Sequence, residues 1–219
     1  VSHYVVSQKA IDREAYKRGT SVYLVDRVIS MLPEVLSNGI CSLNAGEDRY
    51  AMTCMMEIDT HGKVVNYRIQ PSIIHVNRRC SYKEIYKALT EDIIPDDLAP
   101  LMPMIHNLSD IAKTLNDMRR RRGALDFDFP EYKVLLDTEG TPLRIVRRDR
   151  TLAERLIEEC MLIANETVAT HLKNTNRTSV YRIHETPSEE KMSMYQKVLN
   201  YLGQDIRLHL DELEPRVFQ

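Results

Sequence analysis

The chain has 219 residues and a mass of 25.5 kDa, which is enough to bury a sizeable apolar core without disulfide or metal staples. With 43% hydrophobic and 28% charged residues, and with only 7 Gly and 9 Pro, the composition excludes a collagen-like or linker-like polymer. The 30 Lys and Arg residues against 32 Asp and Glu residues give a formal net charge of -2. Nucleic-acid binding through a positive field over the whole molecule is therefore excluded, and only local basic patches could serve.

The four cysteines, Cys41, Cys54, Cys80 and Cys160, lie far apart and form no CxxC pair. No histidine stands at ligand spacing beside them, so we expect reduced thiols rather than a zinc site. The sequence has no basic start followed by an apolar segment and no apolar run of bilayer length. We therefore expect a cytoplasmic protein without a membrane anchor.

The N-terminal part of the chain carries signals for short elements only. They are a β-prone opening at 1–6, a helix at 11–17 before Gly19, a β-rich stretch at 23–29, and a short helix that starts near Pro33 and ends at Asn38-Gly39. Two longer β-prone segments follow, 50–58 and 63–76. They flank the turn residues Asp59-Thr60-His61-Gly62, which predicts a long hairpin.

The rest of the chain alternates helical and hairpin patterns. The predicted elements are a helix that begins at Ser81 with Glu84 at capping-box spacing and stops before Pro95, an amphipathic helix over about 98–122 that ends at Gly123, a hairpin of 132–137 and 143–147, a helix over 151–172, a strand over 180–184, and a helix from Ser188 to Leu202. The acidic tail from Asp205 has no clear pattern. Without a repeat, a linker or a shift in composition, residues 1–219 are predicted to form one α+β unit, with mixed or antiparallel hairpins packed with several helices.

Two groups of arginines mark the strongest local positive charge. They are Arg119, Arg120, Arg121 and Arg122 at the end of the predicted amphipathic helix, and Arg144, Arg147, Arg148 and Arg150 after the second hairpin. Each group could contact phosphates. The alternative is a solvated helix end, because arginines near a helix C-terminus are favoured by the helix dipole.

Phe127 and Phe129 lie between these two groups, and they are two of only 3 phenylalanines in the chain. An aromatic ring flanked by arginines is typical of surfaces where unpaired bases stack while the backbone charge is neutralised. The alternative is that both rings fill the core beside the hairpin.

Glu158 and Glu159 lie side by side on the most clearly predicted helix. Adjacent helical residues point about 100° apart, so only one of the two is expected to face inward. That carboxylate could serve a metal site, or it could be an ordinary solvated acid. The 7 histidines are scattered and no Gly-rich phosphate loop is present, so the residues alone predict an α+β domain that binds single-stranded nucleic acid.

A series of longer motifs occurs in one order along nearly the whole chain. They are Val1-Ser2-His3-Tyr4-Val5, Asp12-Arg13-Glu14-Ala15, Arg18-Gly19-Thr20-Ser21-Val22-Tyr23-Leu24, Met31-Leu32-Pro33-Glu34, Leu36-Ser37-Asn38-Gly39, Cys41-Ser42-Leu43-Asn44, Arg121-Arg122-Gly123-Ala124-Leu125-Asp126-Phe127, Leu156-Ile157-Glu158-Glu159-Cys160-Met161-Leu162-Ile163-Ala164-Asn165, and Tyr181-Arg182-Ile183-His184-Glu185-Thr186-Pro187. This ordered set strongly resembles the catalytic, RNB-type domain of the ribonuclease II and ribonuclease R family.

The resemblance implies processive 3′→5′ hydrolysis of single-stranded RNA to nucleoside monophosphates, with Mg2+ or Mn2+ held by a cluster of aspartates. By motif, Tyr23 and Phe127 look like the aromatic clamp that stacks the last nucleotides of the RNA. Glu158 looks like a carboxylate in the active-site channel. Arg121 and Arg122, just before the clamp phenylalanine, are expected to bind RNA.

Two parts of the family pattern are absent from the 219 residues. The aspartate cluster of the family lies just before the motif at Val1, and a Thr-Ser-Pro-Ile-Arg-Arg-Tyr motif with the catalytic arginine follows beyond Gln219. We therefore expect a central, partial RNB-type domain that holds no metal and is inactive alone. The alternative is a non-catalytic fragment that binds single-stranded RNA or another partner. Apolar surface left open by missing neighbours would favour self-association.

Overall fold

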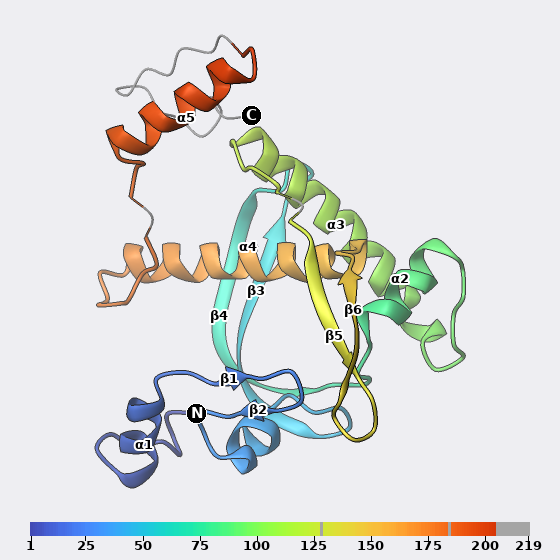
Figure 1. Cartoon of the computed structure of the whole chain (residues 1–219). Coiled ribbons are helices and arrows are strands. Elements are labelled where there is room, and N and C mark those ends of the chain that lie inside the picture. The colour runs from blue at the N-terminus through green and yellow to red at the C-terminus, as the bar shows by residue number, and fades with distance from the viewer. Residues whose placement is uncertain (128, 184, 205–219) are drawn as a thin grey trace. The chain divides into compact units, whose positions relative to one another are not determined.

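A computed structural model describes residues 1–127, 129–183 and 185–204. Its internal contacts divide the chain into two compact units. Unit 1 comprises Val1–Thr53, Ile69–Ile93 and Phe129–Thr151, and unit 2 comprises Cys54–Arg68, Ile94–Asp128 and Leu152–Gln219. Across the described ranges, helices alternate with three two-stranded sheets, which is the α+β class predicted from the sequence (Figure 1).

Unit 1 is built from short elements, among them two two-stranded ribbons. The elements are α1 (Ala10–Arg18), β1 (Val22–Tyr23), β2 (Val28–Ile29), the π-helical turn η1 (Val35–Ile40), α2 (Tyr82–Thr90), β5 (Glu131–Leu136) and β6 (Pro142–Arg148), and the ribbons are β1–β2 and β5–β6. The predicted capping box of α2 is confirmed, because the Ser81 hydroxyl accepts from the Glu84 amide at 3.3 Å and the Glu84 carboxylate accepts from the Ser81 amide at 3.4 Å.

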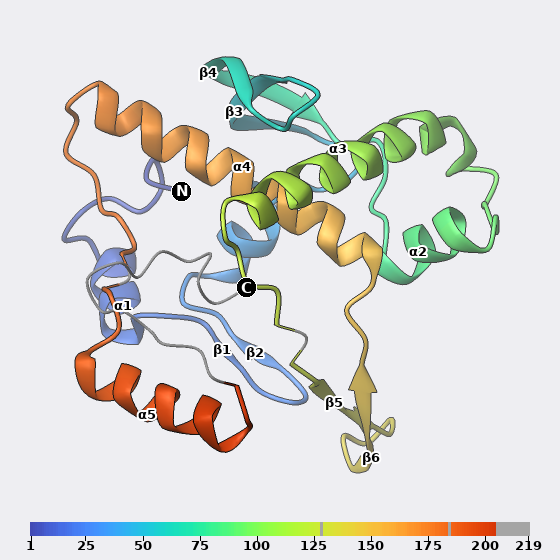
Figure 2. The ribbon, with the colours of Figure 1, turned by 90° about the horizontal axis from the view of Figure 1, so that it is seen from above.

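Unit 2 is dominated by two long helices, α3 (Met102–Arg121) and α4 (Leu152–Asn174), preceded by the 3-10 turn η2 (Ala99–Leu101) and followed by α5 (Glu189–Tyr201). In Figures 1 and 2, α3 and α4 cross and pack against each other. The buried apolar residues of the pair are Met102, Ile105, Ala112, Leu115, Ala153, Leu156 and Ile163. Within the described ranges, no helix combines the length and apolar character needed to cross a membrane.

The predicted long hairpin is present as β3 (Asp48–Ile58) and β4 (Val64–His75), and its turn has the same design as that of β5 and β6. Asp59 Oδ1 accepts from the amides of His61 and Lys63, both at 2.9 Å. Asp137 Oδ1 accepts from the amides of Glu139 and Thr141, at 2.9 and 2.8 Å. These bonds, with Lys63 and Thr141 the main donors, hold the pKa of each carboxyl below its usual value.

Gly62 closes the first turn against α3. Its φ of +87° is a conformation that side chains rarely adopt. A Cβ there would lie 3.2 Å from both Met118 Cβ and the Thr114 carbonyl oxygen. The turn thus requires glycine at this position for two reasons, the backbone angle and the close approach to α3.

Two predicted strands are wrong. Residues 1–6 form turns, in which the amides of Tyr4 and Val5 donate to the Val1 carbonyl at 2.9 and 3.0 Å. Residues 180–183 carry no strand, and Val180 is 99% exposed, so nothing in the described chain pairs with this segment. His184 of that prediction and the tail from Asp205 lie outside the described residues.

Candidate nucleic-acid interface

Tyr23 lies on the narrow β1–β2 ribbon of unit 1, where it pairs with Val28 in the antiparallel register. The residue is 80% exposed. A hydrogen bond joins the chain before β1 to the chain after β2, because the Met31 amide donates to Ser21 Oγ at 3.0 Å. The tyrosine is therefore presented on a short but anchored element.

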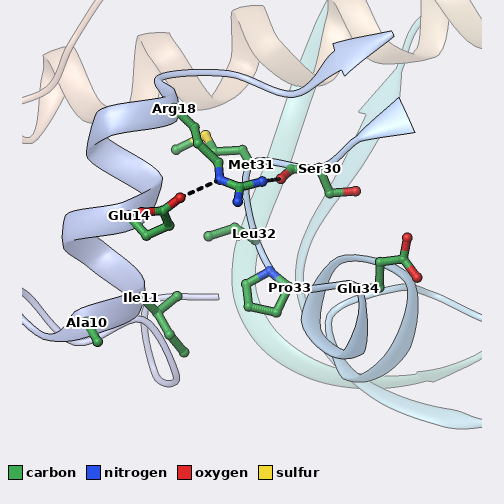
Figure 3. A pocket seen from close by; sticks show the side chains of 9 residues that line it. All are labelled: Ala10, Ile11, Glu14, Arg18, Ser30, Met31, Leu32, Pro33 and Glu34. Carbon is green, nitrogen blue, oxygen red and sulfur yellow. Dashed lines mark hydrogen bonds and ion pairs between the residues drawn. The ribbon is translucent and has the colours of Figure 1, made fainter. Parts of the chain in front are cut away.

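A second anchor of this ribbon comes from α1. Arg18 donates through Nη1 to the Ser30 carbonyl at 2.8 Å and through Nε to the Glu14 carboxylate at 2.9 Å (Figure 3). These bonds border a cavity of about 440 Å³ lined by Ala10, Ile11, Glu14, Arg18, Ser30, Met31, Leu32, Pro33 and Glu34. Arg18 thus joins α1 to the residue that follows β2 and steadies the ribbon that carries Tyr23.

Phe127 lies in unit 2, a few residues after the end of α3. The helix ends in a Schellman motif, in which the Gly123 amide donates to the Arg120 carbonyl at 2.9 Å and the Ala124 amide donates to the Arg119 carbonyl at 3.0 Å. Gly123 takes a φ of +103°, which turns the chain away from the helix axis. Phe127, which follows, is 61% exposed.

The arginines at the end of α3 bind neighbouring groups of the protein. Neither the phosphate-binding interpretation nor that of a solvated helix end predicted this. Arg119 binds Glu159 on α4, with Nη2 and Nε at 2.8 and 3.0 Å from the carboxylate oxygens. Arg121 donates to the His61 carbonyl at the tip of the β3–β4 hairpin, at 3.2 Å. Arg122 binds Glu166 on α4. These arginines therefore fasten the end of α3 to its neighbours in unit 2.

The two ion pairs between α3 and α4 differ in burial. The Glu159 side chain is 3% exposed and the Arg119 side chain 19%, whereas those of Glu166 and Arg122 are 42% and 56% exposed. Asn116 adds a hydrogen bond of 2.9 Å to Glu159 Oε1. Hydrogen bonding to Glu166 raises the pKa of Arg122. The Arg119–Glu159 pair is thus buried between the two helices, and the Arg122–Glu166 pair lies at the surface.

The structure resolves which of the adjacent glutamates faces inward. Glu159 points toward α3, and Glu158 is only partly buried, as expected for neighbours about 100° apart on a helix. The thiol of the next residue, Cys160, has its pKa raised by burial and by the Glu159 charge, so it is protonated at neutral pH. Of the two carboxylates, Glu158 is the one more accessible to a ligand.

The predicted site residues thus fall into both units. Tyr23 belongs to unit 1, whereas Arg121, Arg122, Phe127 and Glu158 belong to unit 2. The sequence reasoning missed Asn116 and Glu166. Their spacing carried a signal, because Asn116 lies three residues from Arg119 and Glu166 lies seven from Glu159, so each pair shares one helix face.

The side chains that the structure describes do not fit a divalent metal. Within the described part of the chain, no three His, Cys, Asp or Glu side chains come together as a ligand set. Among the described carboxylates, Glu159 is the most buried, and it is already bound by Arg119 and Asn116. Oxygen-rich cations such as Mg2+ need several converging oxygen ligands, so no step of a reaction is assigned to a metal held by these residues.

The described fold is α+β, and the two residues predicted to form the aromatic clamp, Tyr23 and Phe127, are both exposed. The sequence model of the RNB domain matches residues 1–216. Ribonuclease R 1 of Lactococcus lactis is 41% identical over 220 residues, covering 100% of this chain and 27% of that protein. Ribonuclease R of Thermotoga maritima is 45% identical over 204 residues, covering 93% of this chain and 29% of that protein.

A solved structure agrees with these relatives. RNase R of Mycoplasma genitalium in complex with ribose methylated single-stranded RNA superposes with a TM-score of 0.92 at 29% identity, covering 99% of this chain and 34% of that one. The chain belongs to the RNB domain family, as its motifs indicated. It spans less than a third of the length of the curated relatives described above.

Proposed function

We propose that this chain is part of a 3′→5′ exoribonuclease and that its own role is to hold the 3′ end of single-stranded RNA. The observation that supports this most directly is the likeness to the RNase R structure in complex with single-stranded RNA, which extends over 99% of the chain. The family match extends over residues 1–216 and so includes both units. We further propose that the two units are parts of a single, partial RNB-type catalytic domain.

In this proposal the rings of Tyr23 and Phe127 stack on bases at the RNA end. Their exposure, 80% and 61%, supports the role, because a stacking ring must be open to its base. Stacking is tolerant of base identity, which suits an enzyme that degrades RNA of any sequence. Glu158 is the carboxylate we place beside the bound RNA, since Glu159 is held by Arg119 and Asn116.

Hydrolysis is proposed to need Mg2+ or Mn2+ bound by carboxylates other than those described above. We expect the 219 residues alone to bind linear oligouridylate without releasing nucleotides when Mg2+ is added. Binding is measured by fluorescence anisotropy in EDTA, and nucleotide release is measured by chromatography after Mg2+ addition. Nucleotide release that persists through stringent purification would contradict the proposal that hydrolysis needs metal-binding carboxylates other than those described above. Absence of binding at low salt would contradict the RNA-binding role itself.

Arg121 and Arg122 are expected to contribute unequally to RNA binding. Arg121 has a neutral partner, the His61 carbonyl, and so keeps its positive charge for a phosphate. Arg122 is bound at both ends of its guanidinium fork by the Glu166 carboxylate, with distances of 3.0 and 2.6 Å.

Arg121→Ala should therefore weaken binding of linear oligouridylate severalfold and lower the slope of log affinity against log salt by about 0.7. Arg122→Ala, the adjacent control, should reduce both the affinity and the salt slope less than Arg121→Ala does. Equal losses for the two variants, or a larger loss for Arg122→Ala, would contradict this assignment.

A further inference from the structure

The β5–β6 ribbon of unit 1 presents both of its faces to solvent. Of its side chains, Tyr132, Leu143 and Ile145 are 66%, 65% and 69% exposed. A two-stranded ribbon on its own is only marginally stable in water. Exposed aromatic and branched apolar side chains on such an element mark a surface that contacts a partner.

The charge of the ribbon indicates what kind of partner fits. Its strands carry four basic side chains, Lys133, Arg144, Arg147 and Arg148, against one acidic side chain, Glu131. The whole chain has a net charge of -2, so this positive charge is a local concentration. A polyanion is the partner that complements it.

The register brings an aromatic ring next to this charge. Tyr132 lies directly opposite Arg147, and the next pair on the same face is Val134 with Ile145. Arg144 and Arg148 project from the other face, opposite Leu135 and Glu131. Basic side chains thus project from both faces of β6, and the Tyr132 ring lies opposite Arg147, the second-to-last residue of that strand.

Two ion pairs of the ribbon arginines are exposed to solvent. Arg147 Nε lies 3.2 Å from Asp149 Oδ1, and Arg148 Nη1 lies 3.8 Å from Glu131 Oε2. The arginine side chains of the two pairs are 56% and 52% exposed. Exposed pairs of this kind contribute little to stability, so a phosphate can replace the carboxylate without loss of the ribbon.

We propose that the β5–β6 ribbon is a second RNA-binding surface, which takes single-stranded RNA along the edge of β6, with phosphates bound by Arg147 from the face of Tyr132 and by Arg144 and Arg148 from the other face, and with a base on Tyr132. This inference rests on the proposed function in one respect, namely that RNA is the ligand of the chain. It differs from the clamp in what it recognises. The clamp needs an RNA end, whereas the ribbon needs only a backbone and a base.

A circular oligouridylate separates the two surfaces, because it has no 3′ end. Its affinity for the full chain, and that of a linear oligouridylate of the same length, is measured in EDTA over a series of salt concentrations. The test variants are Arg144→Ala with Arg147→Ala, and Tyr132→Ala. The matched controls are Arg13→Ala with Lys17→Ala and Tyr16→Ala, which remove exposed side chains of the same charge or kind from α1 of the same unit.

We expect the double arginine variant to bind circular RNA about tenfold more weakly at low salt, with a salt slope lower by about 1.4. Tyr132→Ala should weaken it about fivefold or more. Both controls should bind like the parent chain, and thermal melting checks that every variant is folded.

Circular RNA that binds the ribbon variants and their controls equally well would overturn the proposal. If the variants change only the sedimentation of the chain and not its RNA affinity, the ribbon is a protein contact and the proposal is again overturned. The clamp is judged separately, since loss of linear but not circular binding in Phe127→Ala depends on the clamp alone.

Discussion

Glu159→Gln is expected to lower the free energy of unfolding by about 3 kcal/mol. The Glu159 side chain is 3% exposed and neutralises Arg119, whose own side chain is only 19% exposed. Glutamine keeps the shape of the side chain but removes its charge, which leaves the Arg119 guanidinium largely buried without a counter-charge. Breaking a buried pair from one side is strongly destabilising for this reason.

Glu166→Gln is the matched control, because Glu166 makes the equivalent pair with Arg122 between the same two helices. Its side chain is 42% exposed and that of Arg122 is 56% exposed, so solvent screens the interaction and a loss of no more than about 1 kcal/mol is expected. Urea unfolding of the two variants measures the difference. Equal destabilisation would show that burial does not set the strength of these pairs.

A double variant tests whether the buried pair stabilises the fold or is merely costly to break. Replacing both members of a buried pair by apolar residues of similar size is often neutral. Arg119→Met combined with Glu159→Leu should therefore be more stable than Glu159→Gln, with a higher melting temperature. A double variant less stable than Glu159→Gln would mean that the pair itself stabilises the contact of α3 with α4.

The sequence predicted best those elements that depend on nearby residues. The capping box of Ser81 and Glu84, the Asp59 and Asp137 turns and the glycine that ends α3 are contacts between residues at most five apart, so local pattern is sufficient. The strand expected at 180–184 failed over its described residues, because β-propensity alone cannot supply a partner strand.

The sequence could predict the types of residue in the candidate site, but not which side chains bind one another there. The motifs identified the exposed rings of Tyr23 and Phe127, and they also identified the glutamate pair. Arg119 and Arg122, however, find their carboxylates 40 and 44 residues away on α4. A run of arginines looks the same in the sequence whether it faces solvent, a phosphate or a buried acid. Only the packing of α3 on α4 determines which of these the arginines contact.

Phe127→Ala is expected to weaken binding of linear oligouridylate about 5- to 150-fold, which corresponds to the loss of stacking on one base. Phe127 is the better placed of the two clamp residues for this test. It follows the fixed end of α3, and the adjacent Asp126 carboxylate lies 3.9 Å from the Arg155 guanidinium of α4. The chain before Phe127 is thus tied to α3 and α4, which lowers the ordering entropy that opposes stacking.

Anisotropy titrations in EDTA measure the loss, and Phe127→Trp should restore most of the affinity because it retains an aromatic face. Tyr201→Ala is the control from the same unit, since that residue is 91% exposed and has no role in the clamp. If Phe127→Ala binds like Tyr201→Ala, then Phe127 does not stack on the RNA. If Phe127→Trp binds as weakly as Phe127→Ala, the ring acts through its shape in the protein and the clamp assignment fails.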